Sequence, residues 1–253
     1  MKKKLPVMVC PLRTCVVAAK WLLVLIVALL FTGMAFAASS SGGAPDNELT
    51  DEDKRNGWLL LFDGRTTNGW QTSAAKPSKA PVEQRSLNPH QSGHYMLVHT
   101  QQWSNFLLSL DFKITNKCNS GIFVRVASLE PRPGKDVGFN GIEIAIDDTQ
   151  GAGFHDTGAI YDLVKPAKNA MKPAGEWNHI EIACLENRIE VVLNGEPVTR
   201  ADLELFAEPN KRPDGTAHKF DIAFKDHPKL GYIGLQDHGS PCWFKNIKLK
   251  PIP

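Results

Sequence analysis

The amino-acid sequence predicts an all-β sandwich, and two observations carry this prediction. From residue 94 onward, apolar and polar residues alternate in short runs separated by turn residues, and no helical period longer than one turn interrupts them. Residues 177–198, WNHIEIACLENRIEVVLNGEPV, contain two alternating strands around the turn Glu186-Asn187 and a third strand after Asn194-Gly195. Because Asn-Gly is a strong hairpin signal, this part should form a three-stranded meander that serves as scaffold.

The other elements follow in chain order. Thr50 to Arg55 should form one helical turn that Thr50 caps, with Asp53 at its third position. The expected strands are Trp58 to Phe62, His94 to His99, Phe106 to Ile114, Gly121 to Ala127, Gly141 to Ile146, Asn178 to Leu185, Arg188 to Leu193, Glu196 to Thr199, Gly231 to Gln236 and Cys242 to Leu249. Residues 73–91 are rich in proline, serine and lysine, which indicates a surface loop. Of the three long loops at 129–140, 149–175 and 202–229, the last is charged and should be solvated.

The first 37 residues have the pattern of a secretory signal. Five basic residues without an acid (Lys2, Lys3, Lys4, Arg13 and Lys20) precede the apolar run from Trp21 to Phe31, and a small-x-small cleavage site follows at residues 35–37. The alternative is an uncleaved membrane anchor, since residues 16–37 are nearly long enough to span a bilayer. We therefore expect an exported protein, periplasmic or extracellular, with a linker and leading segment at 38–56 and one domain at 57–253.

Removal of the signal changes the net charge. It leaves 29 − 5 = 24 basic residues against 27 acidic ones, a formal net charge of −3. A mildly acidic chain without a basic tract gives no support to nucleic-acid binding. Three cysteines remain, Cys118, Cys184 and Cys242, and this odd number permits one disulfide and one free thiol in an oxidising compartment, without indicating the pair. The sequence shows no zinc-ligand pattern and requires no cofactor.

The strand at residues 141–147 has two different faces. Ile142, Ile144 and Ile146 fall on one side, and Glu143, Ala145 and Asp147 fall on the other. The apolar side should face the core. The other side carries two carboxylates around an alanine, without a lysine, and such a surface suits a floor on which a ligand rests.

Two further strands repeat this pattern. Opposite their apolar residues lie Asn119, Gly121, Phe123 and Arg125 in the first strand, and Tyr232, Gly234, Gln236 and His238 in the second. If the three strands share one sheet, the functional groups of Arg125, Glu143, Asp147, Gln236 and His238 converge on one face. Glycines at positions 121 and 234 would leave room for a ligand to approach the backbone.

Simpler explanations exist for the same residues. Arg125 and Glu143 would also suit a cross-strand salt bridge, and His238 would also suit a surface turn. Asp147 and Asp148 together with Asn140 would suit a calcium ion, so a bound divalent metal stays an alternative.

The chain also contains, in this order, LFDGRTTNGW, NSGIFVRV, GIEIAIDD, TGAIYDLVKPAKNAMKPAGEWN, VVLNGEPV and GYIGLQDHGSPCWFKNIKLK. Together these segments resemble the 3-keto-disaccharide hydrolase family, over residues 57–249. The resemblance implies a concanavalin A-like jelly roll of two antiparallel sheets, with the site on the concave sheet. It also implies substrates that are glycosides oxidised to a ketone at carbon 3 by a separate sugar 3-dehydrogenase.

This substrate class implies a particular chemistry. A ketone at carbon 3 acidifies the proton on C2, so the glycosidic bond would break by elimination, and water would add afterwards. The reaction needs a base, positive charge or donors on the developing enolate, and an acid for the leaving oxygen. His238 or Glu143 would be the base. Arg125, and Lys172 if its loop closes, would hold the enolate. The residues that would bind the sugar are Asn119, Asp147, Tyr161 and Gln236.

Two other functions fit the same fold. A retaining glycoside hydrolase would use Glu143 and Asp147, the outer acids of a strand similar to ExDxE that here lacks the central acid. Retaining chemistry requires carboxylates about 5 Å apart, whereas strand positions separated by four residues lie about 13 Å apart. A non-catalytic carbohydrate-binding module would use the same polar groups only to bind hydroxyls.

Overall fold

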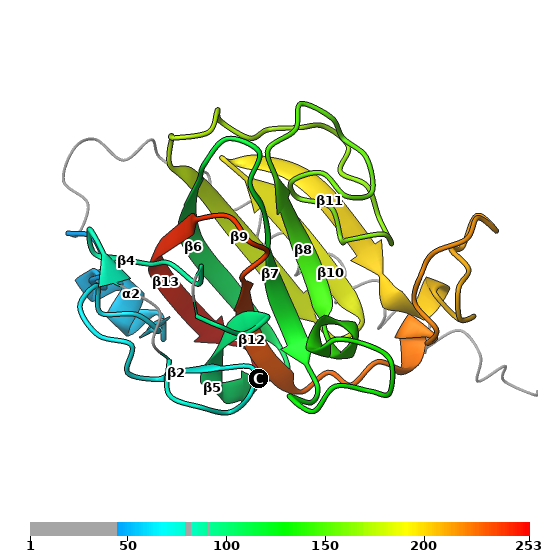
Figure 1. The fold of residues 1–253 in the computed structure, drawn as a ribbon, viewed down its shortest axis with the longest axis horizontal. Helices are drawn as coiled ribbons and strands as arrows, with labels where there is room; N and C mark the ends of the chain where they lie inside the picture. Colours follow the sequence, from blue (N-terminus) through cyan, green and yellow to red (C-terminus); the bar gives the residue numbers. More distant parts are fainter. Residues whose placement is uncertain (1–44, 79–81, 91) are drawn as a thin grey trace, which may run out of the picture. The chain divides into compact units, whose positions relative to one another are not determined.

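Two antiparallel β-sheets pack face to face around the main apolar core (Figure 1), and a second, smaller buried cluster contains Met96, Val98, Phe123, Val126 and Val137. The five-stranded sheet contains, in order, β2 (Trp70–Thr72), β5 (Met96–Trp103), β12 (Gly231–Gln236), β7 (Asn119–Val126) and β8 (Ile142–Asp147). The eight-stranded sheet contains, in order, β11 (Glu196–Asp202), β10 (Arg188–Leu193), β9 (Asn178–Leu185), β6 (Phe106–Ile114), β13 (Cys242–Pro251), β4 (Ser86–Leu87) and β3 (Val82–Glu83), with β1 (Leu59–Leu60) paired to β13. The predicted all-β jelly-roll sandwich of two antiparallel sheets is confirmed.

The structure is a computed structural model that describes residues 45–78, 82–90 and 92–253. The predicted signal at 1–37 and the start of the predicted linker lie outside the described residues. Within the described ranges, no helix combines the length and the apolar character that a membrane crossing needs. Export of the chain therefore stays a prediction.

The predicted helical turn is present as α2 (Asp51–Arg55). The Asp53 N–H donates a hydrogen bond to the Thr50 hydroxyl, and the Thr50 N–H donates one to the Asp53 carboxylate, which forms a capping box. Lys248 Nζ of β13 lies 2.8 Å from Asp53 Oδ1. This part of the segment that leads into the domain is therefore packed against the eight-stranded sheet.

The long strands agree best with the sequence. β6, β9, β10 and β12 have the expected bounds. The structure adds β2, β3 and β4, and the last two lie in residues 73–91, where only a surface loop was predicted. These three strands hold two or three residues each, which is too few for an alternating pattern to be visible in the sequence.

The core lies between the two sheets. In β6, the even-numbered residues from Phe106 to Ile114 are fully buried, whereas the odd-numbered residues face away from the core. Ile142, Ile144 and Ile146 of β8 face them from the other sheet, as predicted. Removal of this apolar surface from water, at roughly 25 cal/mol per Å², holds the sheets together.

The loop at 202–229 is not merely solvated, so that prediction is wrong. In the residues that the structure describes, the loops carry three short 3-10 helices, η1 (Val137–Asn140), η2 (Leu203–Leu205) and η3 (Phe224–Asp226). Around the last two, the loop at 202–229 buries Phe206, Phe220 and Phe224 in the core. Single aromatic residues spaced through a charged segment form no periodic pattern, and for this reason the sequence did not indicate their burial.

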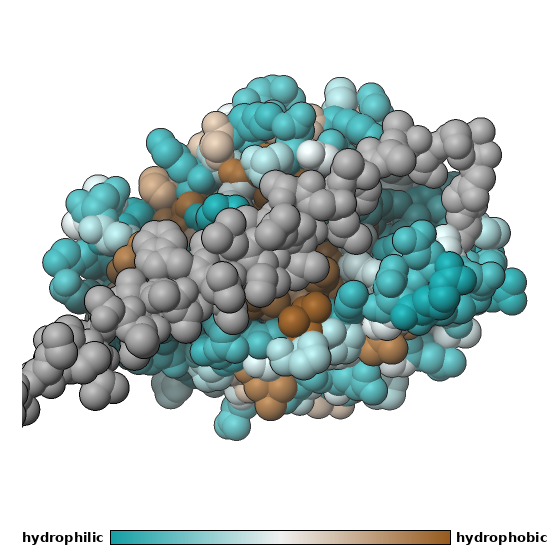
Figure 2. Space-filling model, turned by 180° about the vertical axis from the view of Figure 1, so that it is seen from behind, coloured by the Kyte–Doolittle hydropathy of each residue, from teal (hydrophilic) through white to brown (hydrophobic). Residues whose placement is uncertain are grey.

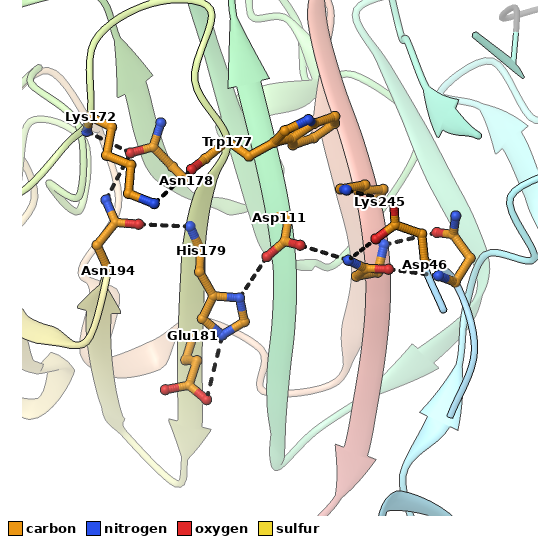
Figure 3. A network of polar contacts seen from close by, with 11 residues as sticks. Asp46, Asp111, Lys172, Trp177, Asn178, His179, Glu181, Asn194 and Lys245 are labelled. Atoms are coloured by element: carbon orange, nitrogen blue, oxygen red, sulfur yellow. Dashed lines mark hydrogen bonds and ion pairs between the residues drawn. The ribbon is translucent and has the colours of Figure 1, made fainter. Parts of the chain in front are cut away.

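A polar network covers part of the outer face of the eight-stranded sheet (Figure 3). His179 Nδ1 lies 2.7 Å from Asp111 Oδ1, and His179 Nε2 lies 3.9 Å from Glu181 Oε1. The second oxygen of Asp111 accepts a hydrogen bond from Asn246 Nδ2 at 2.7 Å. Burial alone would lower the pKa of His179, but the hydrogen bonds to both carboxylates outweigh it and raise the pKa to about 9.

We expect this network to make stability depend on pH. The pKa of His179 rises on folding from about 6.5 to about 9, so the stabilisation is complete below about pH 6.5 and is lost as the pH rises through 9. Because the side chain is 45% exposed, screening limits its contribution to about 1 kcal/mol. In urea unfolding, His179→Gln should be less stable than the wild type at pH 6 and equally stable at pH 10. The control is His94→Gln, since the His94 ring has no hydrogen bond within the described residues; an equal loss for His179→Gln at both pH values would contradict the ion-pair explanation.

The surface seen from behind is mostly hydrophilic where it is described, with apolar residues between the hydrophilic ones (Figure 2). The large apolar residues that are exposed, Leu59, Leu205 and Leu230, come from separate parts of the chain. Singly exposed leucines are common on protein surfaces, and they do not mark a binding site.

Candidate functional site

Three neighbouring strands, β12, β7 and β8, place polar side chains on the outer face of the five-stranded sheet. The register of β7 and β8 pairs Phe123 with Glu143, Gly121 with Ala145, and Asn119 with Asp147. The register of β12 and β7 pairs Leu235 with Ile122, which places Gln236 beside Gly121. Small residues therefore form the middle of this face, and Glu143, Asp147 and Gln236 surround them.

Glu143 is the most perturbed carboxyl group of this face. Its side chain is partly buried, and within the described residues its carboxylate has neither a hydrogen bond nor an ion pair. Burial raises the pKa of Glu143 to about 8, with Asp136 adding to the rise and the positive charge of Lys219 opposing it. A carboxylate with a pKa near neutrality is suited to take up and release a proton as a general base.

Tyr95 and Gln236 form a second polar group on the same face. Gln236 Nε2 donates a hydrogen bond to Tyr95 Oη at 2.9 Å, while Gln236 Oε1 is buried without a hydrogen-bond partner in the described part of the chain. Burial, followed by the negative charge of Glu143, raises the pKa of Tyr95, so this phenol stays a donor at neutral pH. A buried amide oxygen without a partner indicates a position for a water molecule or a ligand hydroxyl.

The loop at 149–175 places Tyr161 beside β8. The Tyr161 N–H donates a hydrogen bond to the Glu143 carbonyl at 2.9 Å, which attaches the loop to the edge of the sheet. The Tyr161 ring stacks on His155 with ring centroids 4.6 Å apart, and Lys219 Nζ lies 4.1 Å from the centre of the Tyr161 ring. Lys219 thereby brings a positive charge to the side of Glu143.

Asn119, Asp147 and His238 lie at the far end of the face. Asn119 Nδ2 donates a hydrogen bond to Asp147 Oδ2 at 3.3 Å. Burial, followed by the negative charges of Asp156 and Asp148, raises the pKa of Asp147. His238 is exposed and follows the last residue of β12, Gln236, by two positions. The structure thus places four of the predicted site residues, Asn119, Glu143, Asp147 and Gln236, on one face. Tyr161 adjoins this face from its loop, and His238 lies just beyond the end of β12.

Arg125 does not lie on this face, and its predicted place was wrong. Residues 123–126 of β7 face residues 232–234 of β12, so two residues oppose one in a β-bulge. Arg125 has φ +53° there, and the extra residue turns its side chain to the other side. Its buried guanidinium donates hydrogen bonds to the carbonyls of Ser104 (Nε, 3.2 Å) and Glu186 (Nη1, 2.7 Å). These carbonyls belong to the β5–β6 and β9–β10 turns, so Arg125 fastens one end of the sandwich.

Lys172 is also placed away from Glu143. Its Nζ donates a hydrogen bond to the Trp177 carbonyl at 3.1 Å, and its N–H donates one to Asn178 Oδ1 at 2.7 Å, where β9 of the other sheet begins (Figure 3). The prediction that Lys172 reaches the enolate is therefore wrong. The loop does pass the site, but the residues that it presents there are Tyr161 and His155.

The predicted calcium ligands are not gathered. Asn140 precedes β8 and Asp147 ends it, which separates them by about 20 Å along a strand. The Asn140 amide instead donates hydrogen bonds to the carbonyls of Ser128 and Glu130. No group of three or more histidine, cysteine, aspartate or glutamate side chains in the described ranges is arranged to hold a metal ion.

Tyr95 and Lys219 were missed by sequence reasoning. Tyr95 directly precedes β5, so the alternation of that strand does not define its side. A Cβ atom at Gly138 of η1 would lie 2.6 Å from Tyr95 Oη, and this close approach fixes the position of the phenol. Lys219 is one of several lysines in the loop at 202–229. The burial of its neighbour Phe220 and the hydrogen bond from its N–H to Asp162 Oδ2, at 2.8 Å, hold it over Tyr161.

Gly121→Ala should lower kcat by about 10²-fold while the protein still folds. The new Cβ would lie 2.8 Å from both Cγ and Oε1 of Glu143, so the carboxylate must move, and if Glu143 is the predicted base, a small displacement has an effect of this size. Gly234→Ala is the matched control, since its Cβ would meet Met96 Sδ and Phe123 Cβ on the same face. Steady-state rates and melting temperatures of both variants test the prediction. An unchanged kcat in Gly121→Ala would contradict a role of Glu143 in catalysis.

Comparisons with known proteins point to one family. A family model described as a 3-keto-alpha-glucoside-1,2-lyase-like domain matches residues 57–250. A 3-keto-disaccharide hydrolase of Bacteroides thetaiotaomicron is 26% identical over 230 residues, which cover 78% of this chain and 79% of that protein.

Two solved structures from Parabacteroides distasonis, both described as candidate glycosyl hydrolases, have the same fold. The first is 25% identical with a TM-score of 0.67 and covers 83% of this chain and 100% of its own. The second is 29% identical with a TM-score of 0.62 and covers 77% of this chain and 99% of its own. The similarity therefore extends over nearly the whole sandwich.

Proposed function

This chain belongs to the 3-keto-alpha-glucoside-1,2-lyase-like family, and we propose that it cleaves glycosides whose carbon 3 has been oxidised to a ketone. It is a carbohydrate-active enzyme related to glycoside hydrolases. The relative from Bacteroides thetaiotaomicron, named for 3-keto-disaccharides, supports this substrate class. The observation that carries the proposal is the Glu143 carboxylate, which has no hydrogen bond and no ion pair within the described residues and a pKa raised to about 8.

The proposed reaction is an elimination followed by addition of water. Glu143 takes the proton from C2, and the electrons of the C–H bond form an enolate with the ketone at C3. When the enolate collapses back to the ketone, a double bond forms between C1 and C2 and the bond from C1 to the glycosidic oxygen breaks. That oxygen takes up a proton and leaves as an alcohol. Water then adds across the C1–C2 double bond and gives the free 3-keto sugar.

The residues around Glu143 supply what this reaction needs. Lys219 and the Tyr95 hydroxyl are assigned to the enolate oxygen, in the place where Arg125 and Lys172 were expected. His238, exposed at the end of β12, is assigned to the leaving oxygen, because an imidazolium donates a proton readily. The residues assigned to the sugar hydroxyls are Asn119, Asp147, Tyr161 and Gln236.

A two-carboxylate mechanism fits this geometry less well. β8 pairs with β7 without a register shift along its whole length, so Glu143 and Asp147 occupy regular positions four residues apart. Such positions are about 13 Å apart. Both retaining enzymes, with carboxylates about 5 Å apart, and inverting enzymes, at about 6.5–9.5 Å, require a closer pair.

The test is an assay of the chain from Ala38 to Pro253 with 3-keto-trehalose, 3-keto-sucrose and an aryl 3-keto-glucoside, beside their unoxidised parents. Products are followed by mass spectrometry and NMR. Turnover of the keto forms alone supports the proposal. Turnover of the parents would establish the two-carboxylate mechanism instead, and binding without turnover would make the chain a carbohydrate-binding module.

Two further arms separate the roles of the side chains. His238→Ala should strongly lower the rate at which 3-keto-trehalose is cleaved. It should change the rate for the aryl substrate little, because an aryl oxygen leaves without a proton donor. Lys219→Met should lower kcat for both substrates. A parallel assay with EDTA tests the expectation that no metal is required.

The proposal places this enzyme after a separate sugar 3-dehydrogenase that supplies the ketone. It also retains the expectation of a protein that is exported, to the periplasm or the outside of the cell, after signal cleavage. The chain would contact a membrane only through its N-terminal segment, if that segment is not cleaved. Fractionation of cells that produce the full chain, with N-terminal sequencing of the product, tests export and cleavage together.

A further inference from the structure

Cys118 and Cys242 lie together at one end of the sandwich. Cys118 closes the turn between β6 and β7, where its N–H donates a hydrogen bond to the Thr115 carbonyl at 3.2 Å. Cys242 begins β13 and pairs with Ile114, the last residue of β6. The N–H of Thr115 donates a hydrogen bond to the carbonyl of Pro241 at 3.4 Å, which joins the two segments directly in front of both cysteines.

The two thiols are also in contact. The side chains of Cys118 and Cys242 are within hydrogen-bonding reach of each other, and both are almost completely buried in the core. Both are free thiols in the structure. Two buried cysteine side chains within such reach of each other meet the first requirement of a disulfide, which is proximity.

Cys184 is too far away to take part. It pairs with Phe106, the first residue of β6, whereas Cys242 pairs with Ile114, the last residue. Eight residues of extended strand separate these two positions, or about 27 Å. The tertiary structure thus distinguishes the three cysteines, which the sequence alone did not.

We propose that Cys118 and Cys242 form a disulfide in an oxidising compartment and that Cys184 remains a thiol. The two thiols lose two protons and two electrons to the disulfide of a thiol–disulfide oxidoreductase or of glutathione, which is reduced to its two thiols. Because burial raises the pKa of the Cys242 thiol, the exchange takes place during folding, before the core closes around it.

The bridge would fasten both sides of the candidate site. β7 begins at Asn119, directly after Cys118, and β12 ends at Gln236, a few residues before Cys242. The disulfide therefore links the turn that leads into β7 with the start of β13, the strand that follows β12, and β7 and β12 both carry the polar face. It also closes a long loop of chain, for which the loss of unfolded-state entropy is large.

Peptide mapping of the refolded chain tests the proposal. The protein is refolded in a buffer of reduced and oxidised glutathione, denatured, treated with N-ethylmaleimide without reductant, and digested. We expect one cross-linked peptide pair that contains Cys118 and Cys242, and one alkylated peptide that contains Cys184. Three alkylated cysteines, or a bridge that includes Cys184, would overturn the proposal.

Thermal unfolding provides a second measurement. Addition of a phosphine reductant should lower the melting temperature of the wild type by about 10 °C. Cys184→Ala should keep this sensitivity, whereas Cys118→Ala and Cys242→Ala should lose it. If the last two variants do not fold, the wild-type peptide map still decides the question. The redox buffer supplies the oxidant, so the result is independent of both export and catalytic activity.

Discussion

Replacement of Glu143 by glutamine should lower kcat for 3-keto-glycosides by about 10³-fold. The amide has nearly the same shape, but it does not accept the C2 proton, and general-base catalysis contributes factors of this size. Binding should change little, because the surrounding Tyr95, Tyr161 and Gln236 remain in place. Steady-state kinetics with 3-keto-trehalose would show this as a loss in kcat with a similar KM.

The pH dependence of the wild type follows from the same carboxylate. The base acts only when it is ionised, so kcat/KM should rise with pH and level off above the pKa of Glu143, which is about 8. The folded state binds this proton more tightly than the unfolded state, so ionisation costs stability as the pH rises from 4.5 to 8. Glu143→Gln should therefore be the more stable protein above pH 8.

Glu190→Gln is the matched control for both measurements. Glu190 lies on β10 of the other sheet and pairs with Arg200, so the same chemical change there should leave kcat and its pH profile unchanged. If Glu143→Gln retained wild-type turnover, the base would have to be another residue, with His238 as the next candidate.

Arg125→Met should lower the free energy of unfolding by about 3 kcal/mol and leave catalysis nearly unchanged. Methionine keeps an apolar stem of similar length, but it lacks the guanidinium that donates hydrogen bonds to the carbonyls of Ser104 and Glu186. Loss of a charged donor from two buried or partly buried carbonyls has a cost of this size. Urea unfolding gives the change in stability, and kcat at 15 °C, where the variant is still folded, gives the effect on catalysis.

Arg200→Met is the comparison for this variant. Arg200 is 76% exposed and pairs with Glu190 on the surface, so its replacement should change stability by less than about 1 kcal/mol. If the Arg125→Met protein were stable but inactive, this would contradict the structural role of Arg125. It would favour the catalytic role that the sequence pattern predicted.

The sequence by itself determined the fold class and the strands that carry the site. Ile142, Ile144 and Ile146 alternate with Glu143 and Asp147, and burial of one side of a strand leaves only one way to orient it. The same rule correctly oriented Asn119 and Gln236. Long strands are predictable in this way because each further residue repeats the pattern.

The tertiary structure decided which charges meet. Alternation placed Arg125 beside Glu143, but the bulge in β7 inserts one residue and turns the guanidinium toward the turns at the end of the sandwich. Lys219 came to the site instead, from a loop held by buried phenylalanines. The sequence pattern did not indicate either position, because a bulge or a loop depends on contacts with residues far away in the chain.

For the cysteines and for Tyr95 as well, the sequence left open what the tertiary structure decided. Composition established that one disulfide is permitted, but the pairing of β6 with β9 and β13 separates Cys184 from Cys118 and Cys242. Tyr95 gains its role from Gln236 and Gly138, which approach it only in the folded chain. The alternation of apolar and polar residues along one strand predicts the side of that strand on which each residue lies. The meeting of residues from different strands and loops is set by register, bulges and packing, and these exist only once the two sheets have come together.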